Sequence, residues 1–511
     1  MEKMANLLTF DVGTTSIKAA VFNETFDVLG SFGREYALNT LPGARVELDP
    51  EIYWEMLKAA AAQFKRQGLL DGVRAVAVTT QGETLIPADR DGRPLDNAVV
   101  WLDARAAAEA AYLSDRVPAD VFYRRTGLPE ITAAMPVAKL LWYKNNRPDI
   151  YEKTCCFFLL EDFLMFRLTG RYVSNQSLLS STGYFCIDTN EYWTEMLETA
   201  GLDARKLPEI LPSAAVAGTA SRPAQEELGL RPDTLVVTSA MDQIASAVGA
   251  GNTRPGVVTV TLGTALVVAA TVESPAFGAP VKERVSIYRH YNKNYIYLPY
   301  CPTAAIILKW FKDNFLGAES EEAARRGESP YAPANALAEA AGPGAGGLLL
   351  LPHFTGKLSP DYNPDVKGVF YGVGLDTDKG CFVRAIMEGV AYMLRENLAF
   401  ISEFGVKPDV VRLLGGGASS RVWRQIAADV CGAAVETFEN RETASLGAGV
   451  MAAVACGLYN SPRETEEYIL RKREYCEPNP GNTAIYDECY GMYLALDAGI
   501  KEMLNKRGRI C

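Results

Sequence analysis

The sequence contains very little histidine. Only two of its 511 residues are histidines, His290 and His353. A zinc site with histidine ligands and a Ser-His-Asp triad are therefore both disfavoured. If the chain is an enzyme, we expect its general base to be an aspartate or a glutamate.

Long apolar runs and regularly spaced cysteines are also missing. No apolar segment reaches the roughly 18 residues that a membrane-spanning helix needs, and the first residues show no long apolar stretch followed by a cleavage site. The ten cysteines include no CxxC pair, although Cys155 and Cys156 are adjacent. We expect reduced, mostly buried thiols, no membrane partner and a cytoplasmic location.

Positive charge is scarcer than negative charge. The chain has 51 Lys and Arg against 62 Asp and Glu, a net charge of −11. This balance disfavours nucleic acid as a partner but allows an anionic small molecule that is bound by local groups. A length of 511 residues exceeds what one core supports, so two large domains are expected.

The chain opens with an apolar run, a polar turn and a second apolar run over residues 7–22. The turn (residues 11–15, DVGTT) offers N–H groups, two hydroxyls and a carboxylate, which suit a nucleotide phosphate and its metal ion. Gly13 permits a backbone conformation that a Cβ would hinder. Taken alone, an ordinary hairpin explains this stretch equally well.

The same design recurs at residues 257–268, where Gly263 and Thr264 interrupt an apolar run. The pattern occurs twice, once in each half of the chain, and is not a short-period repeat. The segment 249–256 (GAGNTRPG) precedes it and indicates a domain boundary, with a hinge at 251–256. The expected domains are residues 1–250 and residues 251–511.

Local patterns predict several other elements. Asp49 and Pro50 indicate the start of a helix, and apolar residues from Phe382 onward recur at helical spacing. A short strand is expected at 98–102 and a largely helical region at 104–168. The tail at 461–511 is expected to be mostly amphipathic helix.

Polar stretches follow buried strands elsewhere. Residues 79–84 (TTQGET) come after an apolar strand at 73–78, and Asp242 and Gln243 follow one at 234–238. Ligands bind at this edge of open α/β sheets. Asp242 also suits a helix N-cap, the commoner use of such an aspartate.

A glycine run at 415–417 lies between an apolar strand and a helix. In that context a glycine run indicates nucleotide binding, whereas a flexible linker seldom stands there. Three glycine turns after apolar strands, two of them at equivalent points, indicate two related α/β domains. The expected fold is therefore two actin-like, ribonuclease H-like ATPase domains around a central cleft.

With these motifs in place, the chain resembles the FGGY carbohydrate kinase family over nearly its whole length. The matching motifs are DVGTT at 11–15, KLLW at 139–142, TLGT at 261–264, KGVFYGV at 367–373, RAIMEG at 384–389 and GGGA at 415–418. The resemblance implies ATP-dependent phosphorylation of a hydroxyl on a small sugar or polyol, with Mg²⁺ as cofactor. In-line transfer to an alcohol fits a chain whose base is a carboxylate.

The resemblance also implies individual roles. Asp242 matches the catalytic aspartate that accepts the hydroxyl proton, and Asp11 matches the residue near magnesium, so Asp11 and Asp242 form the expected metal site. The residues that match the phosphate-binding turns are Gly13, Thr14, Thr15, Gly263 and Thr264. Those that match the adenosine turn are Gly415, Gly416, Gly417 and Ala418.

The substrate motifs point to two branches of the family. The expected sugar-binding residues are Gln81, Gly82, Glu83, Asp103, Arg105, Asp242 and Gln243. The C-terminal half looks like xylulose kinases, whereas Glu83, Thr84 and the pair Asp242-Gln243 resemble glycerol kinases. Gly82 and Ala134 replace larger residues of glycerol kinases, and we expect both to widen the pocket.

We therefore expect a ketopentose of the xylulose or ribulose type as substrate. A kinase of a polyol such as erythritol, a pentitol or glycerol is the alternative within the family. An actin-like ATPase switch and a catalytically silent sugar sensor are alternatives of other classes, which the polar pocket and Asp242 disfavour. The sequence leaves open the phosphorylated hydroxyl, any effector, a homodimer, and the effect of the departures at Ala305, Lys357 and Leu358.

Overall fold

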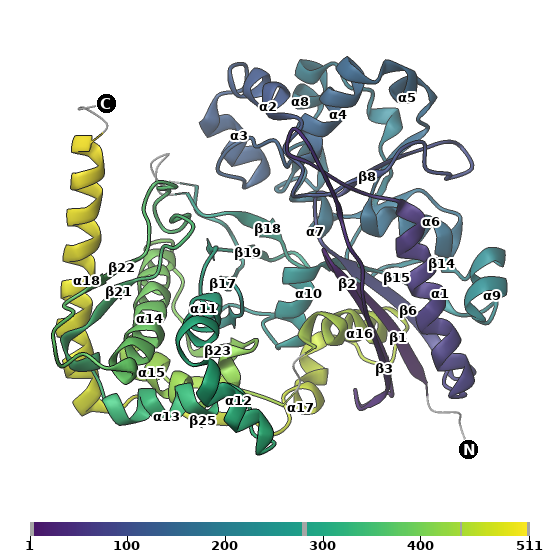
Figure 1. The fold of residues 1–511 in the computed structure, drawn as a ribbon. Coiled ribbons are helices and arrows are strands. Elements are labelled where there is room, and N and C mark those ends of the chain that lie inside the picture. Colours follow the sequence, from purple (N-terminus) through teal and green to yellow (C-terminus); the bar gives the residue numbers. More distant parts are fainter. Residues whose placement is uncertain (1–4, 278–283, 440–441, 508–511) are drawn as a thin grey trace.

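The computed structural model describes residues 5–277, 284–439 and 442–507. Each half of the chain contains a mixed β-sheet flanked by helices (Figure 1). The first sheet has the order β14 (Val216–Thr219), β15 (Leu235–Met241), β6 (Val73–Thr80), β1 (Asn6–Val12), β2 (Ser16–Phe22), β3 (Val28–Glu35). The second has the order β18 (Ile287–Arg289), β19 (Tyr295–Tyr297), β17 (Leu266–Val272), β16 (Val257–Leu262), β23 (Val410–Leu414), β24 (Val435–Thr437), β25 (Glu474–Cys476).

The two sheets share one topology. In each, a central strand (β1 or β16) pairs antiparallel with the next strand and parallel with a later one (β6 or β23). A further parallel strand follows (β15 or β24), and an antiparallel strand (β14 or β25) completes that side. The two Gly-Thr turns therefore belong to two sheets of the same topology, which confirms two related α/β domains.

Helices and smaller sheets complete the first half. The helices are α1 (Pro50–Arg66), α2 (Ala107–Ser114), α3 (Ala119–Thr126), α4 (Pro136–Asn146), α5 (Pro148–Lys153), α6 (Leu160–Thr169), α7 (Gln176–Leu179), α8 (Thr194–Ala200), α9 (Arg222–Leu228) and α10 (Asp242–Gly249). A five-stranded sheet has the order β4 (Asn39–Leu41), β5 (Arg45–Leu48), β8 (Ala98–Val99), β7 (Leu85–Ala88), β9 (Cys156–Leu159). The short pairs are β10 (Val173–Asn175) with β13 (Glu209–Leu211) and β11 (Phe185–Cys186) with β12 (Glu191–Tyr192).

The second half contains several longer helices. Its helices are α11 (Ala305–Phe315), α12 (Gly317–Arg325), α13 (Ala332–Ala341), α14 (Lys379–Glu403), α15 (Arg421–Cys431), α16 (Thr443–Ala455), α17 (Glu466–Ile469) and α18 (Pro480–Arg507). Strand β21 (Leu349–Leu351) pairs with β22 (Val369–Tyr371), and β20 (Tyr300–Cys301) pairs with β17.

Local signals explain where two of the helices begin. The Asp49 side chain accepts a hydrogen bond from the Glu51 N–H (3.0 Å), and Pro50 takes the first position of α1. Asp378 caps α14 in a similar way through the Cys381 N–H (2.9 Å). Both helices predicted from the sequence are therefore confirmed.

Helices α10 and α16 pack against each other between the two sheets (Figure 1). A Cβ on Gly249 would lie 2.0 Å from the Thr443 carbonyl oxygen, and one on Gly447 would lie 1.8 Å from that of Ala245. The two backbones therefore touch directly, which larger residues would prevent. Helix α16 also packs on β1 and β6, although it belongs to the second half of the chain.

One expectation needs correction: the strand expected at 98–102 is only the two-residue β8. The region 104–168 is largely helical, as expected, and also contains β9, which pairs with β7. The C-terminal region is mostly helical, as expected, and contains β25 in addition to α18. Within the described residues, no helix is long and apolar enough to cross a membrane, and the nine described cysteines form no disulfide.

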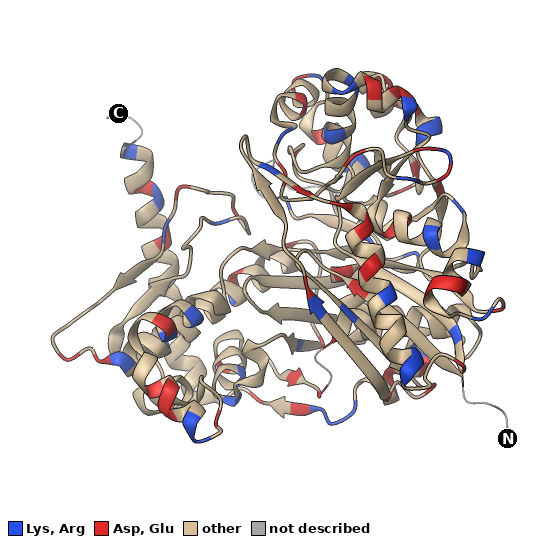
Figure 2. Cartoon of the chain, turned by 45° about the vertical axis from the view of Figure 1, so that its right-hand side comes forward, with Lys and Arg blue, Asp and Glu red and all other residues tan. Residues whose placement is uncertain are grey.

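Charged residues lie mainly on the outer helices and loops. Figure 2 shows Lys and Arg intermingled with Asp and Glu there, while the strands of the two large sheets are mostly uncharged. Charged side chains at the ends of these strands are exceptions to this pattern, and they are therefore candidates for a functional role.

Candidate active site

The first Gly-Thr turn is fixed by two aromatic side chains. The Gly13 N–H donates to the Ser16 carbonyl oxygen (3.0 Å) and closes the turn. The Trp101 indole N–H donates to Thr14 Oγ1 (2.9 Å), and the Tyr36 hydroxyl donates to the Gly13 carbonyl oxygen. The sequence motifs did not identify Trp101 and Tyr36, because aromatic residues near strands usually serve only the core.

The glycines of the two Gly-Thr turns leave space open. Gly13 was expected to need a backbone conformation that a Cβ hinders, but its φ is not positive and a Cβ would meet only the Ser16 carbonyl oxygen at 3.5 Å. That expectation is wrong for Gly13. At Gly263 the nearest protein atom would be 3.8 Å from a Cβ. The free space beside both glycines suits the close approach of a ligand to the backbone, and Thr15 is exposed beside the first turn.

The glycine turn at 415–417 packs on the second Gly-Thr turn. Gly415 has a φ of 82°, and a Cβ there would lie 2.9 Å from the Leu262 carbonyl oxygen. A Cβ on Gly417 would lie 2.5 Å from Leu262 Cγ, whereas Gly416 faces open space. Gly415 and Gly417 therefore bring this turn against the residue that precedes Gly263.

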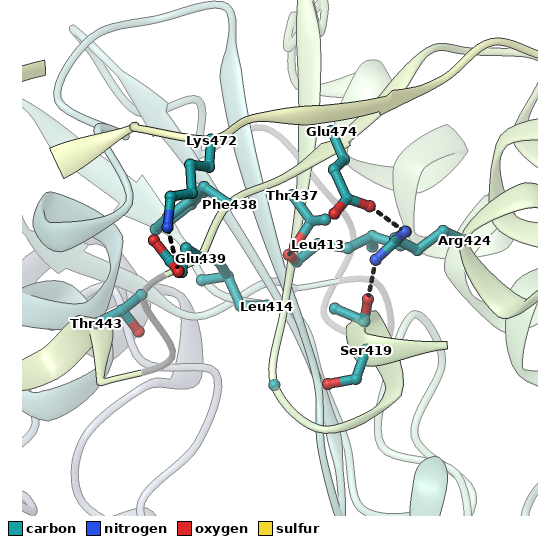
Figure 3. A pocket seen from close by; sticks show the side chains of 12 residues that line it. Leu413, Leu414, Ser419, Arg424, Thr437, Phe438, Glu439, Thr443, Lys472 and Glu474 are labelled. Atoms are coloured by element: carbon teal, nitrogen blue, oxygen red, sulfur yellow. Dashed lines mark hydrogen bonds and ion pairs between the residues drawn. The ribbon is translucent and has the colours of Figure 1, made fainter. Parts of the chain in front are cut away.

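A cavity of about 340 Å³ lies beside this turn, at the carboxyl ends of β23 and β24 (Figure 3). Gly415, Ala418 and Ser419 line one part of it. Two ion pairs border it, Lys472–Glu439 at 2.7 Å and Arg424–Glu474 at 2.5 Å. The cavity joins the expected adenosine turn to the end of the next strand, which no sequence motif had indicated.

Three carboxylates share the site at the end of β15. Asp242, the first residue of α10, accepts a hydrogen bond from the Gln243 N–H (2.6 Å). Burial raises the pKa of Asp242 to about 6, and the charge of Glu83 adds to the rise. Burial also raises the pKa of Asp11 to about 7, with the charge of Asp242 as the next cause. Asp242 is therefore coupled electrostatically to both Asp11 and Glu83.

Strand β15 leaves its regular pairing just before Asp242. Its register with β6 shifts between Thr238 and Met241. Side chains bind the freed backbone groups: Glu161 Oε1 accepts from the Ser239 N–H (3.1 Å), Ser177 Oγ accepts from the Met241 N–H (3.3 Å), and Thr79 Oγ1 donates to the Ala240 carbonyl oxygen (2.7 Å). This irregular strand end fixes the direction in which Asp242 enters the site.

The loop that carries Glu83 is strained and held by a buried lysine. Glu83 has a φ of 61°, a left-handed conformation that costs about 1–2 kcal/mol in a residue with a Cβ. Lys139 Nζ donates to the carbonyl oxygens of Glu83 (3.0 Å) and Val100 (2.9 Å). Burial raises the pKa of Glu83 and lowers that of Lys139. The lysine of the KLLW motif thus fixes this loop.

Gln81 and Gly82 contribute to packing in this loop. The buried Gln81 donates its backbone N–H to the Val12 carbonyl oxygen (3.1 Å), beside the first Gly-Thr turn. A Cβ on Gly82 would lie 3.0 Å from Met241 Sδ and 3.1 Å from Ser181 Oγ. One side of Gly82 is therefore packed against protein atoms, and the widening of the pocket at Gly82 stays a prediction.

Asp103 and Arg105 bind each other, and Arg105 also binds Glu47. Asp103 Oδ2 accepts from the Val46 N–H (2.6 Å), and Arg105 donates to both Asp103 oxygens (2.8 and 2.7 Å) and to Glu47 Oε1 (2.6 Å). The Arg105 guanidinium also lies over the Trp142 ring, 5.0 Å from its centroid. Their charged groups are engaged within the protein, and contact with a sugar stays a prediction.

The donor set at Asp11 and Asp242 fits a divalent cation. Carboxylate oxygens are among the protein ligands that Mg²⁺ prefers, and the charge of Asp242 raises the pKa of Asp11. A bound cation would relieve that repulsion. Lys18, whose charge acts on Asp11, is itself paired with Glu442 (2.7 Å).

Ala305 and Lys357, which differ from the residues usual at these positions in the family, make different contacts. The Ala305 N–H donates to the Gly263 carbonyl oxygen (2.8 Å), so the backbone at the start of α11 contacts the second turn. Lys357 is buried, and its Nζ lies 2.7–3.0 Å from the carboxylates of Glu396, Asp361 and Asp497. Within the described residues these acids form the one group with metal-like spacing, but the ammonium group of Lys357 already interacts with all three.

The paired sheets and their Gly-Thr turns define a two-domain, actin-like ATPase fold. The chain belongs to the FGGY family of carbohydrate kinases, whose N-terminal domain matches residues 6–249 and whose C-terminal domain matches residues 258–456. It is therefore a carbohydrate kinase of a family that uses ATP, generally with a divalent metal. The resemblance seen in the sequence is confirmed.

The proteins similar to the chain include gluconokinases and xylulose kinases. A gluconokinase of Bacillus subtilis (strain 168) is 28% identical over 456 residues, 89% of this chain and 88% of the relative. A xylulose kinase of the same organism is 25% identical over 506 residues, 98% of each chain. The structure of a ligand-bound xylulose kinase from Lactobacillus acidophilus superposes with a TM-score of 0.88 at 23% identity, covering 98% of this chain and 99% of the other.

Proposed function

We propose that this kinase phosphorylates a neutral ketopentose of the xylulose or ribulose type. The observation that carries the proposal is the group of carboxylates at Asp11, Glu83 and Asp242. Carboxylates accept hydrogen bonds from sugar hydroxyls, and their negative charge disfavours an anionic sugar. The nearby cations are engaged elsewhere, Lys139 by two carbonyl oxygens and Arg105 by two carboxylates.

Each part of the site has a task in this reaction. Asp242 accepts the proton of the attacking hydroxyl, and the irregular end of β15 orients its carboxylate. The turns at 13–15 and 263–264 bind the phosphates through backbone N–H groups and hydroxyls. The turn at 415–418 and its cavity hold the adenosine. Mg²⁺, held near Asp11 and Asp242, supplies positive charge to the phosphates when it is bound.

Gluconate is the second candidate substrate. Two relatives named gluconokinase are 28% and 29% identical to the chain over 456 residues. An aldonate carries a carboxylate, however, and would have to bind beside three acidic side chains. A polyol kinase and a sugar-independent ATPase are the remaining alternatives.

A coupled ADP-release assay distinguishes these possibilities. The panel contains xylulose, ribulose, gluconate, erythritol, xylitol, glycerol and fructose, with ATP and Mg²⁺ in every reaction. We expect the highest kcat/KM with a ketopentose. Activity confined to gluconate, or to three-carbon or six-carbon substrates, would overturn the proposal, and ATP turnover that no sugar changes would indicate an ATPase switch.

A further inference from the structure

Strand β18 belongs to the second sheet but packs on the first half of the chain. Figure 1 shows it extending from β19 toward α7. The contacts of its segment with the first half are Arg284 Nη1 to Ala119 O (2.8 Å), Tyr123 Oη to Val285 O (3.0 Å), Ile287 N–H to Gly127 O (2.8 Å), Arg289 N–H to Ser180 Oγ (3.0 Å) and Gln176 Nε2 to His290 O (3.2 Å). The segment 284–290 is therefore held against the first half along most of its length.

Tyr288 lies at the centre of this segment and faces the opposite side from its two neighbours. Ile287 and Arg289 are 0% and 4% exposed, whereas Tyr288 is only partly buried. Because side chains alternate along a strand, Tyr288 projects from the other face. The hydrogen bonds of both neighbours to the first half of the chain hold it in place.

The segment that carries Tyr288 adjoins the loop of Glu83 through Ser180 and Ser181. Ser180, which binds the Arg289 N–H, is followed by Ser181, whose Oγ lies 3.1 Å from the Cβ position of Gly82. Burial raises the pKa of the Tyr288 phenol, and the charges of Glu83 and Asp242 raise it further. The hydroxyl is therefore neutral at physiological pH and can donate a hydrogen bond near the two acids.

We propose that Tyr288 binds the sugar directly, as a contact from the C-terminal half opposite Asp242 and Glu83. This role rests on the proposed sugar kinase activity. The same segment also contacts the linker between the sheets, since His290 Nε2 and the carbonyl oxygen of the buried Asn252 are 2.9 Å apart. Sugar binding thus involves both halves of the chain at once.

The test is Tyr288→Phe, which removes one hydroxyl and keeps the ring. A hydrogen bond between neutral groups contributes about 0.5–1.5 kcal/mol, so we expect the KM for the best sugar to rise about 2–10-fold. The KM for ATP should change less than about twofold. Tyr291→Phe is the matched control, because it removes a hydroxyl from the next tyrosine along the chain, whose raised pKa owes nothing to Glu83 or Asp242.

Monodeoxy analogues of the best sugar make the test specific. The penalty of Tyr288→Phe should vanish for the analogue that lacks the hydroxyl contacted by Tyr288, which a merely structural role would not produce. An unchanged sugar KM, or equal rises in Tyr291→Phe, would overturn the role of Tyr288 while leaving the kinase activity in place. A wild-type protein that phosphorylates no sugar would overturn the proposed function and this contact together.

Discussion

At the scale of single residues, Asp242 is the group on which turnover depends. A positioned general base contributes about 10²–10⁴ in rate. We expect Asp242→Asn to lower kcat by about that factor at saturating sugar and ATP, with Asp233→Asn, an exposed substitution, as the control. A variant that keeps turnover within about tenfold of wild type would remove Asp242 from the role of base.

Glu161 makes stability depend on pH. Burial raises its pKa from 4.5 to about 8, so its folded-state pKa exceeds its unfolded value. The protonated carboxyl stabilises the fold fully at low pH, and that contribution is lost as pH rises through the folded-state pKa of about 8. We expect Glu161→Gln to be more stable than wild type at pH 9, by on the order of 1–4 kcal/mol, and similar to wild type at about pH 5.

The matched control for this prediction is the exposed Glu198→Gln on α8. Thermal melts across about pH 5–9 should show a difference from wild type that grows with pH for the first variant and stays flat for the second. A constant difference for Glu161→Gln would mean that its carboxyl does not titrate in this range.

The residues that sequence motifs could identify are those whose chemistry is local. Asp11, Asp242 and the glycine turns each lie at the end of a strand, and neighbouring residues are enough to mark them. Trp101 binds Thr14 across a separation of 87 positions, and Tyr288 reaches its place only because β18 packs on the other half. The packing of Gly82 against Ser181 and Met241 could not be predicted either, because both residues are distant from it in the sequence.

At the scale of elements, buried Lys357 connects the loop before β22 to helices α14 and α18. Burial lowers its pKa, but the charges of Glu396, Asp497 and Asp361 together raise it above the ordinary value. We expect Lys357→Met to destabilise the protein by about 3–5 kcal/mol, because it leaves the largely buried Glu396 carboxylate without its cation and removes one of the two cations at Asp497. Chemical denaturation measures the loss, and hydrogen exchange should be faster in α18.

Lys501 offers a matched control for that element. It pairs with Asp361 and Asp497 at 2.5 Å each, but its side chain is 26% exposed against 1% for Lys357. Lys501→Met should therefore cost about 1 kcal/mol or less. Equal losses in the two variants would contradict a special role for the buried lysine.

At the scale of the whole molecule, one apolar core extends across both halves. It contains Leu7 and Phe22 of the first sheet together with Leu446 and Val450 of α16. The sequence predicted the two similar sheets through their paired turns. It did not predict that α16 would cross to the first sheet, because the small residues of that helix form no distinct apolar face.

Because α16 of the second half packs on the first sheet, we predict that the first half of the chain cannot fold alone. A fragment of residues 1–250 would expose the surfaces of β1, β6 and α10 that α16 covers in the full chain. We expect the fragment to aggregate or to lack a cooperative thermal transition, whereas the full chain melts in one step because its core is continuous. Size-exclusion chromatography and near-UV circular dichroism check this. A monomeric fragment with a cooperative melt close to that of the full chain would show that the predicted domain boundary near residue 250 separates two independent cores.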